Sequence, residues 1–110
     1  MNFSTERIGN TLRIRLQGEI DHHNAGEVRT RIDRVLEAEK PESLRFNLSA
    51  VSFCDSSGLG LVMGRFRKCC AMGIDMTVEE PSDAVNKILR IAGMDQMLHI
   101  ERSDGNGKAS

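Results

Sequence analysis

The sequence predicts an α/β fold, with a single domain in which about five strands form a mixed β-sheet and helices pack on it. Two apolar patterns alternate along its 110 residues. One has the period of two that is typical of strands, and the other has the longer period that is typical of helices. The order of these segments, β-β-α-β-α-β-α-β, requires parallel as well as antiparallel strand pairs.

The strands are predicted mainly from alternation. Residues 3–8 are followed by a Gly9-Asn10 turn and an alternating segment, as in a β-hairpin. A second alternating segment runs on toward Phe53, and a last strand is expected over 97–100. The apolar positions of the three central strands are Leu12, Ile14 and Leu16; Leu44, Phe46 and Leu48; and Ile74, Met76 and Val78.

Three helices are predicted from apolar residues at helical spacing. Asn24 is expected to cap the first helix, which should stop near Lys40 because a proline follows. The second should begin after Asp55 and end at Gly73, and the third should end at Gly93. The expected apolar stripes are Val28, Ile32, Val35 and Leu36; Leu59, Val62, Met63, Phe66 and Cys70; and Val85, Ile88, Leu89 and Ala92.

Composition restricts the class of protein. With 15 basic and 16 acidic residues, the chain lacks the positive field expected of nucleic-acid or membrane-surface proteins. Its apolar runs are far shorter than the roughly 20 residues that span a bilayer, and no signal peptide is expected. Three cysteines without a C-x-x-C pair fit a cytoplasmic protein without disulfides or zinc. We expect one domain over 3–100 and a disordered polar tail over 101–110, with no cofactor or metal.

The segment most informative about function is Phe-Cys-Asp-Ser-Ser-Gly-Leu-Gly, residues 53–60, where a buried strand leads into a helix. Two interpretations are open. Asp55 or Ser56 could simply cap the free N–H groups of the helix. Alternatively, a hydroxyl here could accept a phosphoryl group, whose negative charge suits the positive end of a helix.

Three stretches of the chain carry a resemblance to a known family: Gly-Glu-Ile-Asp-His-His at 18–23, the strand at 48–53, and Asp-Ser-Ser-Gly-Leu-Gly at 55–60 with Gly64-Arg65. Over roughly residues 3–100 the chain resembles the STAS-domain anti-sigma factor antagonists, and most closely the sporulation anti-sigma F factor antagonists. Family members often end with a further amphipathic helix, and the residues after Ile100 lack the apolar spacing for one.

The resemblance implies partner switching. The unphosphorylated protein would bind an anti-sigma factor that is also a serine kinase, and the sigma factor would be released. The kinase would phosphorylate Ser57, the serine directly before the glycine, and a metal-dependent serine phosphatase would reset it. The residues expected to contact the partner are Asp21, Asp55, Ser56, Gly58 and Gly60. Gly58 and Gly60 are expected to let a kinase or partner backbone approach closely, so that Gly58→Val should damage phosphorylation more than stability.

Other functions fit the sequence less well. A receiver-type phosphorylated Asp55 would need an acidic pair after the first strand and a lysine after the last parallel strand, and neither is present at those places. The adjacent His22 and His23 do not converge on one metal ion. No nucleophile elbow or P-loop occurs. The alternative to the antagonist is a STAS subunit or scaffold of a larger transport or stress-sensing complex, without a phospho-switch, and direct nucleotide binding is a third possibility.

Some residues are given structural roles. Arg65, Arg67 and Lys68 are expected to form a solvated face near the end of the second helix. Leu59, Val62, Met63 and Phe66 are expected to belong to the core rather than to a ligand pocket. Cys54 and Cys69 are expected to be small buried apolar side chains rather than redox groups.

Overall fold

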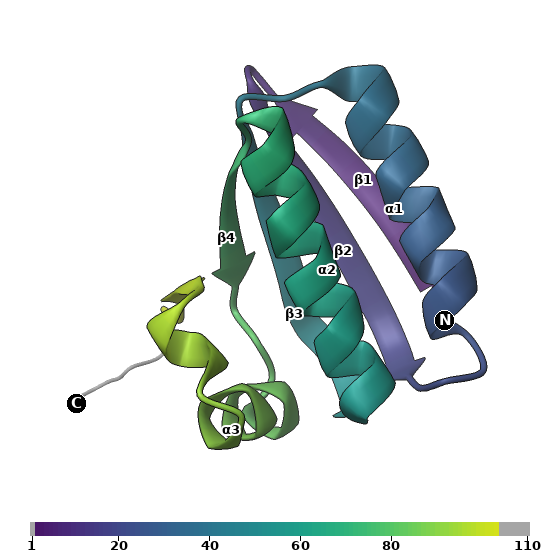
Figure 1. Cartoon of the computed structure of the whole chain (residues 1–110), viewed down its shortest axis with the longest axis vertical. Coiled ribbons are helices and arrows are strands. Elements are labelled where there is room, and N and C mark those ends of the chain that lie inside the picture. The colour runs from purple at the N-terminus through teal and green to yellow at the C-terminus, as the bar shows by residue number, and fades with distance from the viewer. Residues whose placement is uncertain (1, 104–110) are drawn as a thin grey trace.

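The computed structural model describes residues 2–103 and contains one five-stranded mixed sheet in the order β1-β2-β3-β4-β5. The antiparallel pair is β1 with β2, and the remaining neighbours are parallel (Figure 1). The strands are β1 Asn2–Ile8, β2 Thr11–Ile20, β3 Ser43–Cys54, β4 Asp75–Glu79 and β5 His99–Glu101. The predicted fold class and element order are therefore confirmed.

Two long helices lie side by side on one face of the sheet, α1 (Ala25–Glu39) and α2 (Ser56–Met72) (Figure 1). A shorter helix, α3 (Asp83–Ile91), packs near the end of β3, where Ser82 Oγ donates to the Val51 carbonyl at 2.6 Å. A 3₁₀ turn, Met94–Gln96, then leads to β5. Within residues 2–103, no helix is long and apolar enough to cross a membrane.

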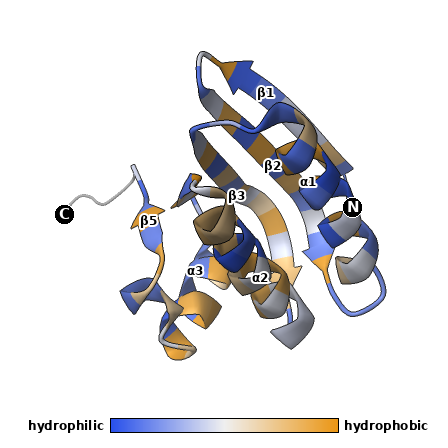
Figure 2. Ribbon diagram, turned by 45° about the horizontal axis from the view of Figure 1, so that its top comes forward, coloured by the Kyte–Doolittle hydropathy of each residue, from blue (hydrophilic) through white to orange (hydrophobic). Residues whose placement is uncertain are grey.

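The core lies between the sheet and the helices. Hydrophobic and hydrophilic residues alternate along the strands, as Figure 2 shows, because successive side chains point to opposite faces. The apolar face is covered by α1 and α2, and each large side chain buried there contributes about 1.5–3 kcal/mol relative to exposure. Side chains with no exposed surface include Ile14, Leu16, Ile32, Phe46, Leu48 and Val62.

The opposite face of the sheet is polar and is organised around the buried Glu79. Its carboxylate accepts from Arg13 Nε at 2.6 Å, from Arg45 Nε at 2.5 Å and from Asn47 Nδ2 at 2.7 Å. Burial alone would raise the pKa of Glu79, but these three donors outweigh it and lower the pKa to about 2. Arg45 also pairs with Glu101 of β5. Ionised Glu79 therefore ties three strands together on this face.

The apolar stripe predicted for α2 is wrong by about one residue. Its buried positions are Gly58, Leu61, Val62, Arg65 and Cys69. Leu59, Met63 and Phe66 pack against the core only partly buried, and Cys70 is exposed. The stripe is shifted because α1 lies alongside α2, so the helix buries a face toward α1 as well as toward the sheet.

The prediction of a solvated Arg65 is also wrong, because the residue is buried, at 6% exposure. Its Nε lies 3.0 Å from Asp33 Oδ1 on α1, and its Nη1 is buried without a hydrogen-bond partner among residues 2–103. Burial lowers the pKa of Arg65, Asp33 opposes this, and the positive charge of Arg29 adds to it. The buried Arg65 is therefore held between the helices mainly by its ion pair with Asp33.

Element ends agree closely with prediction at several places. Helix α1 ends at Glu39 with Lys40 in the left-handed region at φ 45°, and α2 ends at Gly73 with φ 73°. The tail predicted over 101–110 begins too early, because Glu101 belongs to β5. The remaining prediction of disorder falls mainly on residues 104–110, which lie outside the described residues.

The predicted roles of two cysteines are confirmed. Cys54 and Cys69 are 6% and 0% exposed, and burial raises the pKa of both thiols to about 11. A thiol with so high a pKa is almost entirely protonated near neutral pH, so neither cysteine is activated as a nucleophile.

Candidate functional site

The candidate site lies where the parallel strands β2 and β3 end next to each other. Ile20 and Cys54 are paired in the sheet, and Asp55 N donates to the Ile20 carbonyl at 3.3 Å. Asp21 and Asp55 therefore follow neighbouring strand ends. The carboxyl ends of parallel strands are where open α/β sheets commonly bind ligands.

Asp55 caps α2. Its backbone is extended, and its Oδ1 accepts from Ser57 N at 2.8 Å and from Gly58 N at 3.1 Å. Two of the N–H groups that a helix start leaves without partners are thereby satisfied. The predicted capping role belongs to Asp55 and not to Ser56, which is exposed as the first residue of the helix.

Ser57 is half-buried, and its hydroxyl makes no hydrogen bond to any other described residue. It lines a shallow depression of about 290 Å³ between α1 and α2, together with Ala25, Gly26, Arg29, Gly60 and Leu61. The hydroxyl is thus available to chemistry from outside, and modifying it would break no contact that holds the fold.

Gly58 has a different role from the one predicted. It is buried, and a Cβ on it would overlap Cys54 Sγ and lie 3.2 Å from Ile20 Cγ2. The glycine is therefore required by internal packing of α2 against the two strand ends, not by the approach of a partner. Gly60 is exposed, and a Cβ there would meet nothing within 4 Å. Of the two glycines, Gly60 is the one that a partner could reach.

Asp21 organises the loop that precedes α1. Its Oδ1 accepts from His23 N at 2.9 Å and from Asn24 N at 3.3 Å, and its carbonyl accepts from Ala25 N at 2.9 Å. Asn24 stands at the N-cap position but makes no side-chain cap, contrary to prediction. Its Oδ1 instead accepts from Asp21 N at 3.1 Å, and its Nδ2 donates to the Glu19 carbonyl. The loop is held by its own side chains.

The histidines of this loop form no metal site. The rings of His22 and His23 lie 4.0 Å apart, and both residues are exposed. No group of three or more His, Cys, Asp or Glu residues within 2–103 could hold a metal ion. The polar groups of the site include the hydroxyls of Ser56 and Ser57 and the carboxylates of Asp21 and Asp55, which suit modification and recognition.

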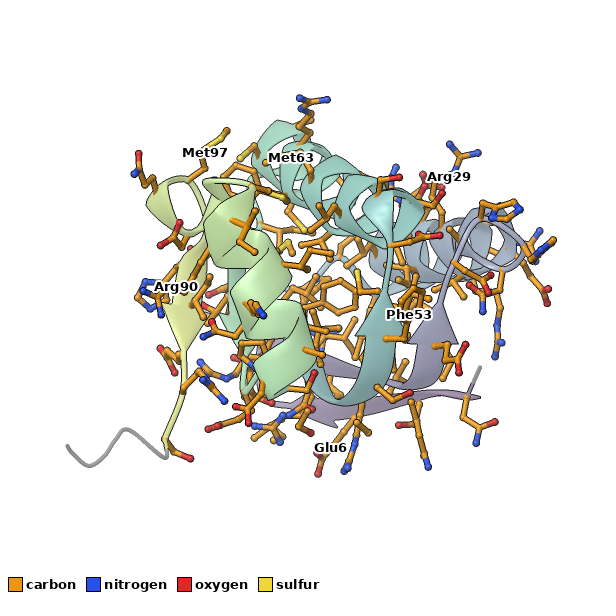
Figure 3. The ribbon with its side chains drawn as sticks, turned by 90° about the horizontal axis from the view of Figure 1, so that it is seen from below. Glu6, Arg29, Phe53, Met63, Arg90 and Met97 are labelled. Atoms are coloured by element: carbon orange, nitrogen blue, oxygen red, sulfur yellow. The ribbon has the colours of Figure 1, made fainter. Side chains whose placement is uncertain are left out.

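Two residues of this region were missed by sequence reasoning. Phe53 was assigned to a continuing strand, yet its side chain is 49% exposed near the strand end, as Figure 3 shows. An exposed aromatic next to a polar loop is a feature of protein-binding surfaces. Arg29 was not singled out at all, and it lines the depression with Ser57. No spacing in the sequence relates Arg29 to Ser57, because the two residues lie on different helices.

Comparison with known proteins gives one family. The family model described as STAS domain matches residues 2–106. The chain is 35% identical over 95 residues to the anti-sigma F factor antagonist of Lysinibacillus sphaericus, covering 86% of this chain and 81% of that relative. It is 31% identical over 93 residues to that of Paenibacillus polymyxa, covering 84% and 80%.

Solved structures agree with this result. The anti-sigma factor antagonist SpoIIAA in its unphosphorylated form matches with a TM-score of 0.76 and 31% identity, covering 94% of this chain and 90% of that one. The same protein solved in its phosphorylated form matches with a TM-score of 0.70 and 30% identity, covering 94% of each chain. The fold and the relatives therefore point to the same class of regulatory protein.

Proposed function

The chain belongs to the STAS domain family, and we propose that it is an anti-sigma factor antagonist that phosphorylation of Ser57 switches off. The observation that carries the proposal is the unpartnered, half-buried Ser57 hydroxyl at the first turn of α2. The kind of relative found supports it, since the similar proteins are named as antagonists and SpoIIAA is described in a phosphorylated form.

In this proposal the unphosphorylated protein binds an anti-sigma factor that is also a serine kinase. The contact surface comprises the loop at Asp21, the exposed Phe53, and the start of α2 with Ser56 and Gly60. Binding displaces the sigma factor, and transcription begins. The protein acts as a binding partner and kinase substrate in the cytoplasm and not as an enzyme.

Phosphorylation reverses the binding. The kinase transfers the γ-phosphoryl group of ATP to Ser57 Oγ, the hydroxyl proton leaves, and ADP is released. The added charge of about −1.5 to −2 is expensive to bury against a partner without a counter-charge. A penalty of about 3–4 kcal/mol weakens binding by two to three decades. A metal-dependent serine phosphatase then hydrolyses the ester.

The first test is intact-mass spectrometry after incubation with ATP and lysate from the source cells, followed by fragmentation. We expect one phosphoryl group on Ser57, absent from Ser57→Ala and retained by Ser56→Ala, which removes the neighbouring hydroxyl. Absence of phosphate, in a lysate that modifies a known kinase substrate, would contradict the proposal and favour a scaffold without a phospho-switch.

The second test measures binding to the anti-sigma factor by calorimetry. Ser57→Ala should bind as tightly as the unphosphorylated protein and remain bound when ATP is added. Ser57→Asp places a negative charge at the same point and should bind more weakly. Equal affinities for the two variants would contradict the switch.

A further inference from the structure

The depression beside Ser57 has the shape of a small anion site. Ser57 and Gly60 lie on the face of α2 that meets α1, and Gly26 lies opposite on α1. A Cβ at Gly26 or Gly60 would meet nothing within 4 Å, so these walls are bare. The volume of about 290 Å³ far exceeds the ~30 Å³ of one water molecule, and it accommodates a phosphoryl group.

One charged side chain lines this depression, and it is Arg29. Arg29 is exposed and makes no hydrogen bond or ion pair with any other described residue. Figure 3 shows it on the outer side of the helix layer, directed away from the sheet. Its charge acts on the buried Arg65, whose partner Asp33 supplies only one negative charge. Arg29 therefore places a positive charge beside Ser57 that has no anionic partner among residues 2–103.

We propose that this depression receives the phosphoryl group of phosphorylated Ser57 and that Arg29 is its counter-ion. The inference rests on the proposed function, because it takes Ser57 as the modified residue. A guanidinium can donate two parallel hydrogen bonds to phosphate oxygens, and such charge-assisted pairs are stronger than neutral ones. The Asp55 carboxylate, which accepts from Ser57 N at 2.8 Å, carries a negative charge that repels the phosphoryl group.

The consequence is that the phosphate is held by the domain itself. With the phosphoryl group turned toward Arg29, its charge is partly offset within the chain, and α2 need not unwind. The negative group also covers the bare glycine walls, so a partner that packs against Gly60 meets a filled and charged surface. By pairing with the phosphoryl group, Arg29 allows phosphorylation to weaken partner binding without unfolding the domain.

The test installs phosphoserine at position 57 during translation, by suppression of an amber codon, and follows its phosphorus NMR signal through a pH titration. A free phosphoserine has a second pKa near 6. We expect this pKa to be lower in the native sequence than in Arg29→Gln by about half a unit. Arg29→Lys, which keeps the charge, should retain most of the shift.

Arg34→Gln is the matched control, since it removes an exposed arginine from a different face of the same helix. It should titrate like the native sequence. Every variant retains His22 and His23, so these side chains are the same in all the proteins compared. Equal phosphoserine pKa values in Arg29→Gln and the native sequence would overturn the inference. Phosphoserine is installed here without a kinase, so equal pKa values would contradict the role of Arg29 and would leave the proposed function untouched. Conversely, if no kinase modified Ser57, the proposed function would fail and the phosphoserine titration could still be carried out.

Discussion

Gly58 offers the sharpest test of how the switch segment is built. A Cβ at this position would lie well inside 3.0 Å of Cys54 Sγ, and 3.2 and 3.3 Å from Ile20 Cγ2 and Cβ. Ordinary contacts between such atoms need about 3.5–4.0 Å. Cys54 and Ile20 are 6% and 0% exposed, so neither can withdraw into solvent. Gly58→Ala must therefore turn the Cys54 side chain out of its place in the core or push α2 away from the two strand ends.

The free energy of unfolding should fall accordingly. Overpacking of this kind destabilises by about 1–3 kcal/mol, and the better helix propensity of alanine returns at most about 1 kcal/mol. We expect a net loss of about 1–2 kcal/mol, or roughly 4–16 °C in the unfolding midpoint of a domain of this size. Cys54→Ala alone should also destabilise the domain, because it leaves a small cavity.

The double variant Gly58→Ala/Cys54→Ala tests whether the clash with Cys54 Sγ causes the loss of stability. With Sγ absent, the new Cβ of Gly58→Ala occupies the vacated space, so the combined loss should be smaller than the sum by about 1–3 kcal/mol. Urea unfolding is best followed by far-ultraviolet circular dichroism, because the chain has no Trp or Tyr. Gly60→Ala is the control, since its Cβ would meet nothing within 4 Å, and it should stabilise the domain slightly. The packing argument would be refuted if the losses of unfolding free energy in Gly58→Ala and Cys54→Ala added up in the double variant. It would also be refuted if Gly58→Ala and Gly60→Ala had the same stability.

Three further predictions concern regions outside the switch. Because the pKa of Glu79 is about 2 in the folded chain and about 4.5 otherwise, its ionisation stabilises the fold above about pH 5, and this stabilisation is lost as the pH falls toward 2. Glu79→Gln should therefore cost about 2 kcal/mol at pH 7, after allowance for solvent screening, and the difference should shrink in acid urea titrations. Iodoacetamide with peptide mapping should label the exposed Cys70 well before Cys54 or Cys69, whose thiols are buried and have a pKa of about 11. Lys40→Gly should raise the unfolding free energy by about 0.5–1 kcal/mol, measured by urea unfolding, because Lys40 closes α1 at φ 45°.

The sequence was sufficient for the parts of the fold that depend on local patterns. Alternation at Leu12, Ile14 and Leu16 identifies a strand and the face it buries, since side chains on a strand alternate between faces. The Asp55 cap is equally local, because an N-cap acts on N–H groups only two or three residues away. Such features need no knowledge of neighbouring elements.

The features that sequence reasoning missed depend on how separate elements meet. The sequence around Arg65 suggests a solvated cation, but in the structure Asp33 of α1 lies 3.0 Å from its Nε. Arg29 belongs to the Ser57 depression only because α1 and α2 lie side by side. Gly58 is buried because two strand ends converge beneath it. Spacing along one helix cannot supply these distances between different elements.

The adjacent Ser57 and Gly58 explain how the domain can carry a switch without losing its fold. Successive residues of a helix point about 100° apart, so one can face the depression between α1 and α2 while the next faces the core. Gly58 fixes the height of α2 above Cys54 and Ile20, and Asp55 Oδ1 fixes the first turn through both backbone N–H groups. The position of the Ser57 hydroxyl is thus set by contacts that its own side chain does not make. A phosphoryl group added there changes the surface that a partner meets and leaves those contacts in place.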